Sequence, residues 1–278
     1  MSGLRVLSEN SADGWWEMVS HQPDASLRGV VRSYTGYREY STIPVRRKEI
    51  PGADVGLILS FGPTIRVLEK ADTGVVLAEP SSFVAELGTR YAITEYRGEQ
   101  HGVQLMLTPL GAGMVLGMPL GVLEGQAVEL TDLLGAPVRR LIERLAETPT
   151  WEGRFAVLDA FVSARLSDAR RPSPAAAFVW RRLCETDGRI PIGMLVDELG
   201  CSHRYLLSEF TAYLGIAPKS FARILRARRA RRLISEGTML LRDVAMDCGY
   251  SDQAHLSREF RAITGESPSG WHPRLFPD

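Results

Sequence analysis

The sequence predicts an α+β protein in two parts: a small N-terminal β-barrel with two following helices, and a C-terminal all-α domain with two helix-turn-helix units. Three observations carry this prediction. Residues 1–126 contain short β-rich runs between turn residues, residues 131–168 change to a helical period, and residues 195–271 contain one motif twice. We expect residues 1–170 to form the first domain and residues 175–278 the second.

Length and composition indicate an ordinary globular protein. The chain has 278 residues, of which 45% are hydrophobic and 24% charged, and its formal net charge is zero. Residues 175–278 carry 15 lysines and arginines against 12 acidic residues, the sign expected of a part that meets phosphate. The sequence shows neither a signal peptide nor an apolar run of about 20 residues, so we expect a cytoplasmic protein.

Six β-rich runs predict the strands of the N-terminal domain. Turns such as Pro51-Gly52 and Gly62-Pro63 separate them, and this spacing favours a small barrel of cupin-like type or a sandwich. The runs are Val55–Phe61, Thr64–Leu68, Gly74–Leu77, Phe83–Leu87, Tyr91–Tyr96 and Val103–Leu107. The glycine-rich stretch Pro109–Gly125 is assigned to no element.

Helices are expected at about 131–147 and 151–168, each with an apolar stripe. The stripes would either pack onto the helices' own barrel or form a dimer interface. The stretch Arg170–Pro174 is expected to be a linker, because its two prolines suit neither a helix interior nor a strand.

Nothing in the sequence points to a metal site, a cofactor or catalysis. His21 and His101 stand far apart in the first domain, and Cys184, Cys201 and Cys248 have spacings that fit neither zinc nor a disulfide framework. We expect the three thiols to be buried. The aromatic residues of the first forty positions would line an effector pocket, stack on a partner or fill a core; they are Trp15, Trp16, Tyr34, Tyr37 and Tyr40.

Residues 195–221 and 244–271 are two copies of one motif. The first reads LVDELGCSHRYLLSEFTAYLGIAPKSF and the second VAMDCGYSDQAHLSREFRAITGESPSGW. From Leu206 onward the copies align at an offset of 50, and before it at 49, so the second copy has one extra residue at its turn. Such repetition indicates a duplicated structural unit.

Each copy has the features of a helix-turn-helix, expected at about 192–215 and 241–265. A small residue stands at the helix crossing, a glycine in the turn, a serine at the N-cap of the second helix and a leucine at its apolar anchor. The paired positions are Val196/Ala245, Gly200/Gly249, Ser202/Ser251 and Leu206/Leu256.

A basic linker helix is expected at about 218–235, with no acidic residue between Lys219 and Arg232. It would be about 27 Å long, which suits two reading helices in successive major grooves about 34 Å apart. The alternative is a solvated face without a partner. The side chains expected to contact phosphate are Lys219, Arg223, Arg226, Arg228 and Arg229.

The segment CGYSDQAHLSREFRAITGESP resembles the signature of the AraC/XylS family of bacterial transcription regulators. The first copy, followed by IAPKSFARILRARRARRLI, resembles that family's first reader and linker helix. The resemblance covers about residues 175–274, and implies seven helices in two helix-turn-helix subdomains that bind promoter DNA and contact RNA polymerase. The stretch YRGEQHGVQLMLTPLGAGMVLGMPLG resembles the sensor half of actinobacterial members.

The resemblance also implies base-contacting positions. In the first unit they fall on Arg204, Leu207 and Ser208, and in the second on Gln253, Ala254, His255, Ser257 and Arg258. We expect base contacts from Arg204, Gln253, His255, Ser257 and Arg258. Arg258 is favoured most, because a guanidinium reads guanine O6 and N7 together. Leu207 and Ser208 replace long polar residues, so readout by the first unit is expected to be narrow.

The sequence therefore predicts a non-enzymatic, sequence-specific regulator of transcription that binds double-stranded promoter DNA. Its N-terminal domain would bind an unknown small-molecule effector or form a homodimer. One alternative is a nonspecific architectural or adaptor protein with weak DNA affinity. Another is a barrel enzyme with a vestigial DNA module, which requires a clustered polar pocket in residues 1–126.

Overall fold

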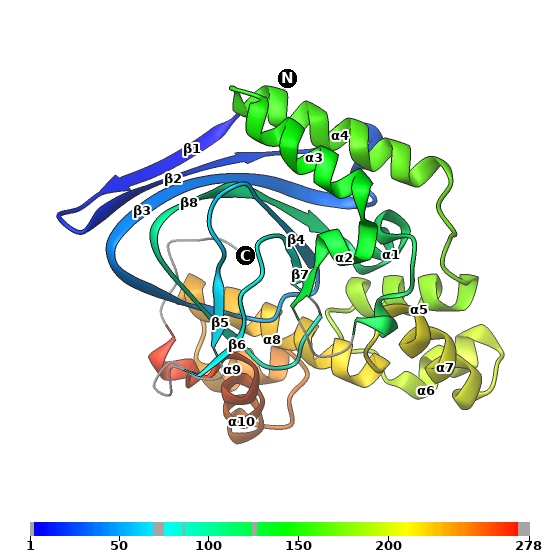
Figure 1. The fold of residues 1–278 in the computed structure, drawn as a ribbon. Helices are drawn as coiled ribbons and strands as arrows, with labels where there is room; N and C mark the ends of the chain where they lie inside the picture. The colour runs from blue at the N-terminus through cyan, green and yellow to red at the C-terminus, as the bar shows by residue number, and fades with distance from the viewer. Residues whose placement is uncertain (1–2, 69–74, 86, 124–126, 272–278) are drawn as a thin grey trace. The chain divides into compact units, whose positions relative to one another are not determined.

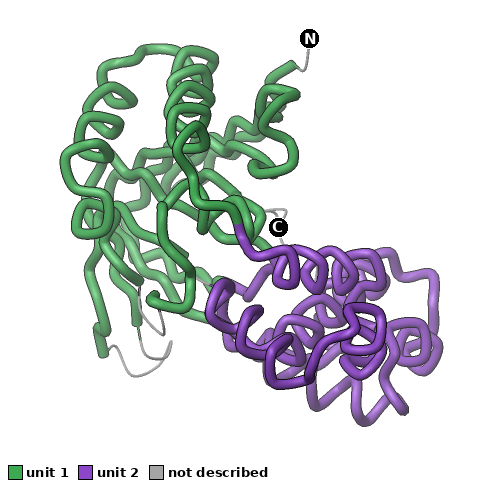
Figure 2. The backbone as a smooth tube through the Cα atoms, turned by 90° about the vertical axis from the view of Figure 1, so that its right-hand side faces the viewer, with its two compact units in different colours: residues 1–49, 54–86, 92–171 green, residues 50–53, 87–91, 172–278 purple. Residues whose placement is uncertain are grey.

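The computed structural model of the protein describes residues 3–68, 75–85, 87–123 and 127–271. The chain forms two compact units (Figure 2). The first contains residues 1–49, 54–86 and 92–171, and the second contains residues 50–53, 87–91 and 172–278. Gly74 and Glu86, which belong to two of the expected strands, lie outside the described residues.

The first unit is built on one antiparallel sheet of nine strands (Figure 1). Its main path has the order β1-β2-β3-β8-β4-β7-β9, and β5 pairs with both β6 and β8. The strands are β1 Arg5–Asn10, β2 Gly14–His21, β3 Val31–Glu49, β4 Val55–Ser60, β5 Arg66–Leu68, β6 Val76–Ala78, β7 Phe83–Ala85, β8 Ala92–Leu107 and β9 Val128–Glu129.

The long strand β8 corrects one expectation. Tyr91–Tyr96 and Val103–Leu107 were expected as separate strands, but β8 is continuous from Ala92 to Leu107. The strand continues through both of its glycines, because Gly98 pairs with Ser41 of β3 and Gly102 pairs with Tyr37. Gly98 has a φ of 84° beside a shift in the β3–β8 register, so it marks an irregularity within β8 and not its end.

The two faces of this sheet differ in chemistry. On one face, Tyr34 of β3 lies opposite Leu105 of β8, and both are fully buried. On the other face, Glu39 lies opposite Gln100, and both polar side chains are also buried. The alternation of side chains along a strand therefore separates an apolar face from a polar one.

Four helices belong to the first unit: α1 Pro109–Leu116, α2 Leu130–Leu134, α3 Ala136–Glu147 and α4 Trp151–Ser167. The helix expected at 131–147 is broken, because Gly135 adopts a φ of 61° between α2 and α3. Helix α1 occupies part of the stretch that was assigned to no element. It begins with Thr108 as N-cap and ends at Gly117.

Figure 1 shows α3 and α4 side by side over one face of the sheet. The ring of Phe155 on α4 stacks on Tyr34, whose hydroxyl donates a 2.7 Å hydrogen bond to Asp159. The apolar residues Leu141 of α3 and Leu158 of α4 are buried within the chain. Of the two alternatives for these stripes, the structure therefore shows packing onto the protein's own sheet.

The second unit contains six α-helices among the described residues. They are α5 Pro174–Glu185, α6 Ile192–Leu199, α7 His203–Leu214, α8 Pro218–Glu236, α9 Leu241–Asp247 and α10 Gln253–Thr264, and a 3₁₀ turn follows at Pro268–Gly270. Pro174, which was expected in the linker, is the first residue of α5, a position where its missing N–H costs no hydrogen bond.

We predict that Gly36→Ala destabilises the first unit. A Cβ at Gly36 would lie 2.3 Å from the indole ring of Trp151, so the ring must move and its packing is lost. We expect a loss of about 1–3 kcal/mol in the free energy of unfolding, measured by urea denaturation. The matched control is Gly29→Ala, because a Cβ there meets no atom within 4 Å. Equal stabilities of the two variants would contradict the packing described here.

Candidate nucleic-acid interface

Helix α7 is the second helix of the first helix-turn-helix. It begins after Ser202, whose side chain accepts a hydrogen bond from the amide of Tyr205, and it ends at Gly215. The turn before it contains Gly200 at a φ of 62°, a conformation that side chains with a Cβ rarely adopt. The inward side of α7 is apolar, since Leu206 and Phe210 are fully buried.

Helix α10 is the equivalent element of the second copy. Its N-cap is Asp252, which accepts a 2.7 Å hydrogen bond from the amide of His255. This corrects the assignment of Ser251, because the extra residue of the second turn moves the cap one position along the chain. These hydrogen bonds hold the pKa of Asp252 below its ordinary value. The buried side of α10 includes Leu256 and Phe260.

Three of the five expected base contacts are exposed on these helices. Arg204 lies in the first turn of α7, and Gln253 and Arg258 lie on the outer side of α10. The guanidinium groups of Arg204 and Arg258 are exposed, and the charge of Arg258 helps to lower the pKa of the neighbouring Asp252. Tyr205, which sequence reasoning did not single out, is 49% exposed beside Arg204.

The other two expected contacts make internal contacts. The ring of His255 packs edge-on against Tyr250 at 5.2 Å, and its Nδ1 lies 3.1 Å from Oγ of Ser251. The hydroxyl of Ser257 donates a 2.9 Å hydrogen bond to the carbonyl of Gln253. These contacts favour supporting roles at the start of α10, and base contact by either residue stays a prediction.

Helix α8 connects the two helix-turn-helix units and is buried on most of its circumference. It is about 28 Å long at 1.5 Å per residue. It packs against α5 and α7 on one side and against α9 and α10 on the other. Phe221 joins Phe210 in the first core, and Ala230 joins the second core around Phe260.

The arginines of α8 find acidic partners on other helices and turns. Arg229 is central, because its Nη1 lies 2.5 Å from Asp187 in the α5–α6 turn and its Nε lies 2.8 Å from Asp247 at the end of α9. One guanidinium thus links the α5–α6 turn to the end of α9. The same hydrogen bond from Arg229 holds the pKa of Asp247 below its ordinary value.

A second ion pair joins α8 to α10, the second helix of the second helix-turn-helix. Arg223 lies 2.8 Å from Glu259 of α10, and Arg226 lies 3.9 Å from the same carboxylate while its guanidinium covers the ring of Tyr250. The sequence has no acidic residue between Lys219 and Arg232, but in the structure Asp187, Asp247 and Glu259 from other segments pair with these arginines. Phosphate contact by Arg223, Arg226 and Arg229 stays a prediction that must compete with these pairs.

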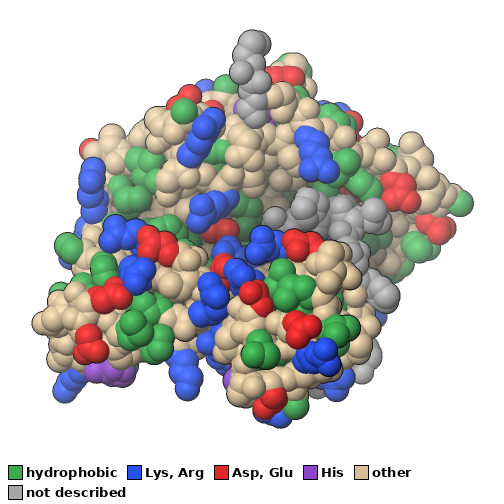
Figure 3. Space-filling view, turned by 180° about the vertical axis from the view of Figure 1, so that it is seen from behind, with side chains coloured by type: hydrophobic (Ala, Val, Ile, Leu, Met, Phe, Trp, Pro, Cys, Tyr) green, Lys and Arg blue, Asp and Glu red, His purple; other side chains and the backbone are tan. Residues whose placement is uncertain are grey.

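Two of the expected phosphate contacts are more accessible. Lys219 is exposed at the start of α8, and the side chain of Arg228 is 36% exposed with its nearest acidic oxygen, on Asp187, at 4.0 Å. In the lower part of Figure 3, basic and acidic side chains are interspersed over the helical unit. This pattern agrees with the ion pairs in which arginines of α8 are neutralised by acidic residues of the same chain.

Three acidic residues that form ion pairs with α8 were not predicted from the sequence: Asp187, Asp247 and Glu259. One signal pointed to the last of them, because Glu209 and Glu259 occupy the same position in both copies. Asp187 carries a structural signal, since its φ of 48° is unusual for a residue with a Cβ. Of the three cysteines, Cys248 is buried and burial raises its pKa to about 11, whereas Cys184 and Cys201 are only half-buried.

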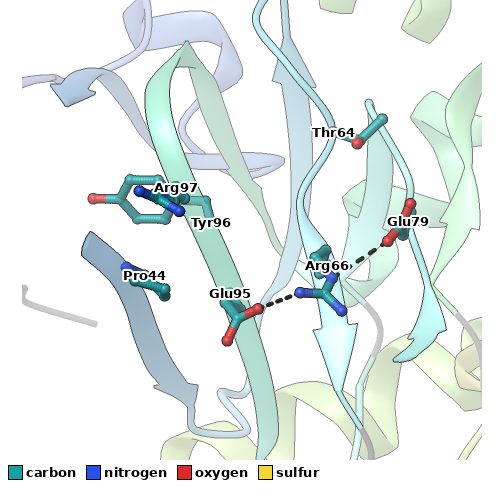
Figure 4. A pocket seen from close by; sticks show the side chains of 7 residues that line it. All are labelled: Pro44, Thr64, Arg66, Glu79, Glu95, Tyr96 and Arg97. Atoms are coloured by element: carbon teal, nitrogen blue, oxygen red, sulfur yellow. Dashed lines mark hydrogen bonds and ion pairs between the residues drawn. The ribbon is translucent and has the colours of Figure 1, made fainter. Parts of the chain in front are cut away.

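The first unit contains a polar hollow of about 380 Å³ (Figure 4). Arg66 crosses it, with Nη1 2.6 Å from Glu95 and Nε 3.3 Å from Glu79. Its lining residues are Pro44, Thr64, Arg66, Glu79, Glu95, Tyr96 and Arg97. The hydroxyl of Tyr96 donates to Glu39, so the hollow borders the polar face of the sheet.

Among the described residues, no group of three His, Cys, Asp or Glu side chains is placed to hold a metal ion. No helix in the same ranges has the length and apolar character to cross a membrane.

Comparison with known proteins links the helical unit to a family. Residues 195–274 match the family model of a helix-turn-helix domain. The chain is 28% identical over 154 residues to the HTH-type transcriptional activator RhaR of Klebsiella pneumoniae, an alignment that covers 54% of this chain and 49% of that protein. The chain therefore spans about half the length of this curated relative.

Solved structures give further similarities. A probable AraC family transcriptional regulator from Rhodopseudomonas palustris is 31% identical, covers 35% of this chain and 93% of its own, and has a TM-score of 0.32. ToxT from Vibrio cholerae is 14% identical, covers 85% of this chain and 95% of its own, and has a TM-score of 0.45.

We predict that Arg229→Gln destabilises the helical unit, because it leaves Asp187 and Asp247 without their shared cation. Hydrogen bonds to charged groups contribute about 1.5–3 kcal/mol, so we expect a loss of this order in the free energy of unfolding. Lys219→Gln is the control, since Lys219 is exposed on the same helix. It should change stability by less than about 0.5 kcal/mol. The two are compared by thermal and urea denaturation.

The lowered pKa of Asp247 predicts a pH dependence. A carboxyl whose pKa is lower in the folded state than its ordinary 3.8 stabilises the fold above that value. This contribution is lost as the pH falls through the lowered pKa. The wild type should therefore exceed Asp247→Asn in free energy of unfolding at pH 6, and the difference should shrink below about pH 4. A difference that stays constant down to pH 3 would show that ionisation of Asp247 does not stabilise the fold.

Proposed function

We propose that this chain, which belongs to the AraC/XylS family through the helix-turn-helix domain of residues 195–274, is a transcription regulator that binds specific promoter sequences. The relative RhaR is a transcriptional activator, which supports this role. Activity, target sequence and partners of the whole protein are part of the proposal.

One observation supports this proposal most strongly. Helices α7 and α10, which we call the reading helices, have exposed polar faces and pack on opposite sides of the largely buried helix α8. Helices α7 and α10 each have a buried apolar side and an exposed outer side, which includes Arg204 on α7 and Arg258 on α10. Helix α8 packs against both helix-turn-helix units, which fixes the separation of the outer sides of α7 and α10. Such a pair suits two successive major grooves on one side of B-DNA.

Base contacts and phosphate contacts fall on different residues in this proposal. Arg204, Gln253 and Arg258 are the best readers of base edges, because their side chains are exposed near the start or on the outer side of a reading helix. Lys219 and Arg228 are the best phosphate contacts, because the structure leaves them more accessible than the paired arginines of α8.

The first unit is proposed as the regulatory part, with a barrel-like, cupin-like sheet. The polar hollow around Arg66 suits a small polar effector, since both charge signs and the Thr64 side chain line it. Contact with RNA polymerase is proposed from the family alone. A homodimer is proposed on a different surface, described in the next subsection.

The competing function is nonspecific, architectural binding of DNA. One observation favours it: the outer face of α7 offers Arg204 beside Leu207 and Ser208, which read little sequence. Purified protein is incubated with fragmented genomic DNA at physiological salt, and the retained fragments are sequenced. Enrichment of a common sequence supports the regulator, and uniform retention supports the architectural protein.

The two classes of contact predict different mutant behaviour on an enriched fragment. Arg258→Ala should cost about 1–3 kcal/mol in binding and relax the preference at one base pair. Arg228→Ala should weaken binding to every sequence alike and reduce the salt dependence by about one ion. Fluorescence anisotropy at several salt concentrations measures both. Uniform losses for Arg258→Ala would reassign it to phosphate, and altered base preference for Arg228→Ala would overturn the role given to α8.

A further inference from the structure

Strand β1 is an open edge of the sheet. It begins the strand order, and no strand of the described ranges pairs with its free side. Natural edges are blunted by short length, charged side chains, proline, a bulge or a cover, because unpaired N–H and C=O groups invite another strand. The opposite edge, β9, is two residues long and leads directly into α2.

The charges of β1, on Arg5 and Glu9, have opposite signs, so they do not exclude a second copy of the same strand. Its six residues, Arg5–Asn10, contain no proline or lysine, and all six pair with β2 without a register shift. Five of the six side chains are exposed, including 53% of Val6. In an antiparallel ladder alternate residues turn their N–H and C=O groups away from the neighbouring strand, so this edge presents a row of free donors and acceptors.

The side chains of β1 make the strand complementary to itself. Side chains alternate between the faces, so Arg5, Leu7 and Glu9 lie on one face. When two copies run antiparallel about a two-fold axis at Leu7, Arg5 of each copy lies opposite Glu9 of the other. Leu7 then lies opposite its own equivalent. A shift by one residue removes both charge pairs.

We propose that β1 is the interface through which two copies of this chain associate, with antiparallel pairing centred on Leu7 and one sheet continuous across the dimer. Two opposite-charge pairs between Arg5 and Glu9 select this register, because like charges directly opposite each other destabilise a sheet. The apolar stripes of α3 and α4 are covered within the chain, so this partner surface is independent of them.

Charge reversal in the full-length protein tests the pairing. Glu9→Arg places arginine opposite Arg5 twice in each dimer, and Arg5→Glu places glutamate opposite Glu9 twice. Each single variant should raise the dimer dissociation constant about tenfold, measured by sedimentation equilibrium. The double variant, or an equimolar mixture of the two single variants, restores opposite charges and should associate like the wild type. Glu143→Arg, with the same charge change on an exposed position of α3, is the control and should leave association unchanged.

A disulfide tests the register in a Cys184→Ser, Cys201→Ser background. Leu7→Cys puts two thiols directly opposite each other, at a Cα separation of about 4.5–5.5 Å that a disulfide can span. Ser8→Cys puts them on a diagonal of about 7–8 Å, beyond easy reach. We expect oxidation to link Leu7→Cys and not Ser8→Cys, with circular dichroism showing both variants folded.

Three results would overturn the proposal. The first is a wild type that stays monomeric at all concentrations. The second is a dimer that both single charge reversals leave intact. The third is equal cross-linking of the cysteines at positions 7 and 8. None of these outcomes touches the reading helices, so the proposal of DNA binding would stand without the dimer.

Discussion

The constraint on which the helical unit depends is the burial of an arginine-rich helix between two apolar cores. Helix α8 contributes Phe221 to one core and Ala230 to the other, so it cannot turn its arginines uniformly toward water. A charge that is partly withdrawn from water needs a partner. Asp187, Asp247 and Glu259 supply that partner from three different places in the chain.

This arrangement changes the physical meaning of the basic stretch. A run of arginines without acids in the sequence suggests a surface for phosphate, whereas the structure uses Arg223 and Arg229 to hold helices together. Arg229 bridges the α5–α6 turn and the end of α9, so it lies at the junction of the two helix-turn-helix units. The ion pairs of Arg229 oppose independent rotation of the two helix-turn-helix units. The proposed binding to successive major grooves of DNA requires such a fixed separation. The charge left for phosphate is correspondingly small.

The two faces of the first unit's sheet follow from the alternation of side chains along its strands. Tyr34 and Leu105 face the helices, while Glu39 and Gln100 face the other way, so one sheet supports an apolar core and a polar surface together. The polar surface leads to the hollow around Arg66, and the far end of the same sheet leaves β1 open.

Local signals determined much of this protein. Gly215 and Gly265 end helices, Ser202 caps one, and Gly200 turns the chain, because each effect acts over a few residues and can be recognised along the sequence. Where local signals competed, the prediction was wrong: Asp252 and not Ser251 is the cap, and Gly98 makes an irregularity within β8 and does not end it.

Tertiary structure alone decided the partners of the arginines. Asp247 and Asp187 lie 18 and 42 positions from Arg229, and such pairs depend on how helices pack rather than on spacing in the sequence. The same holds for the covered stripes of α3 and α4 and for the open edge at β1. Burial and strand order arise only when distant segments meet, whereas caps and turns need only their neighbours.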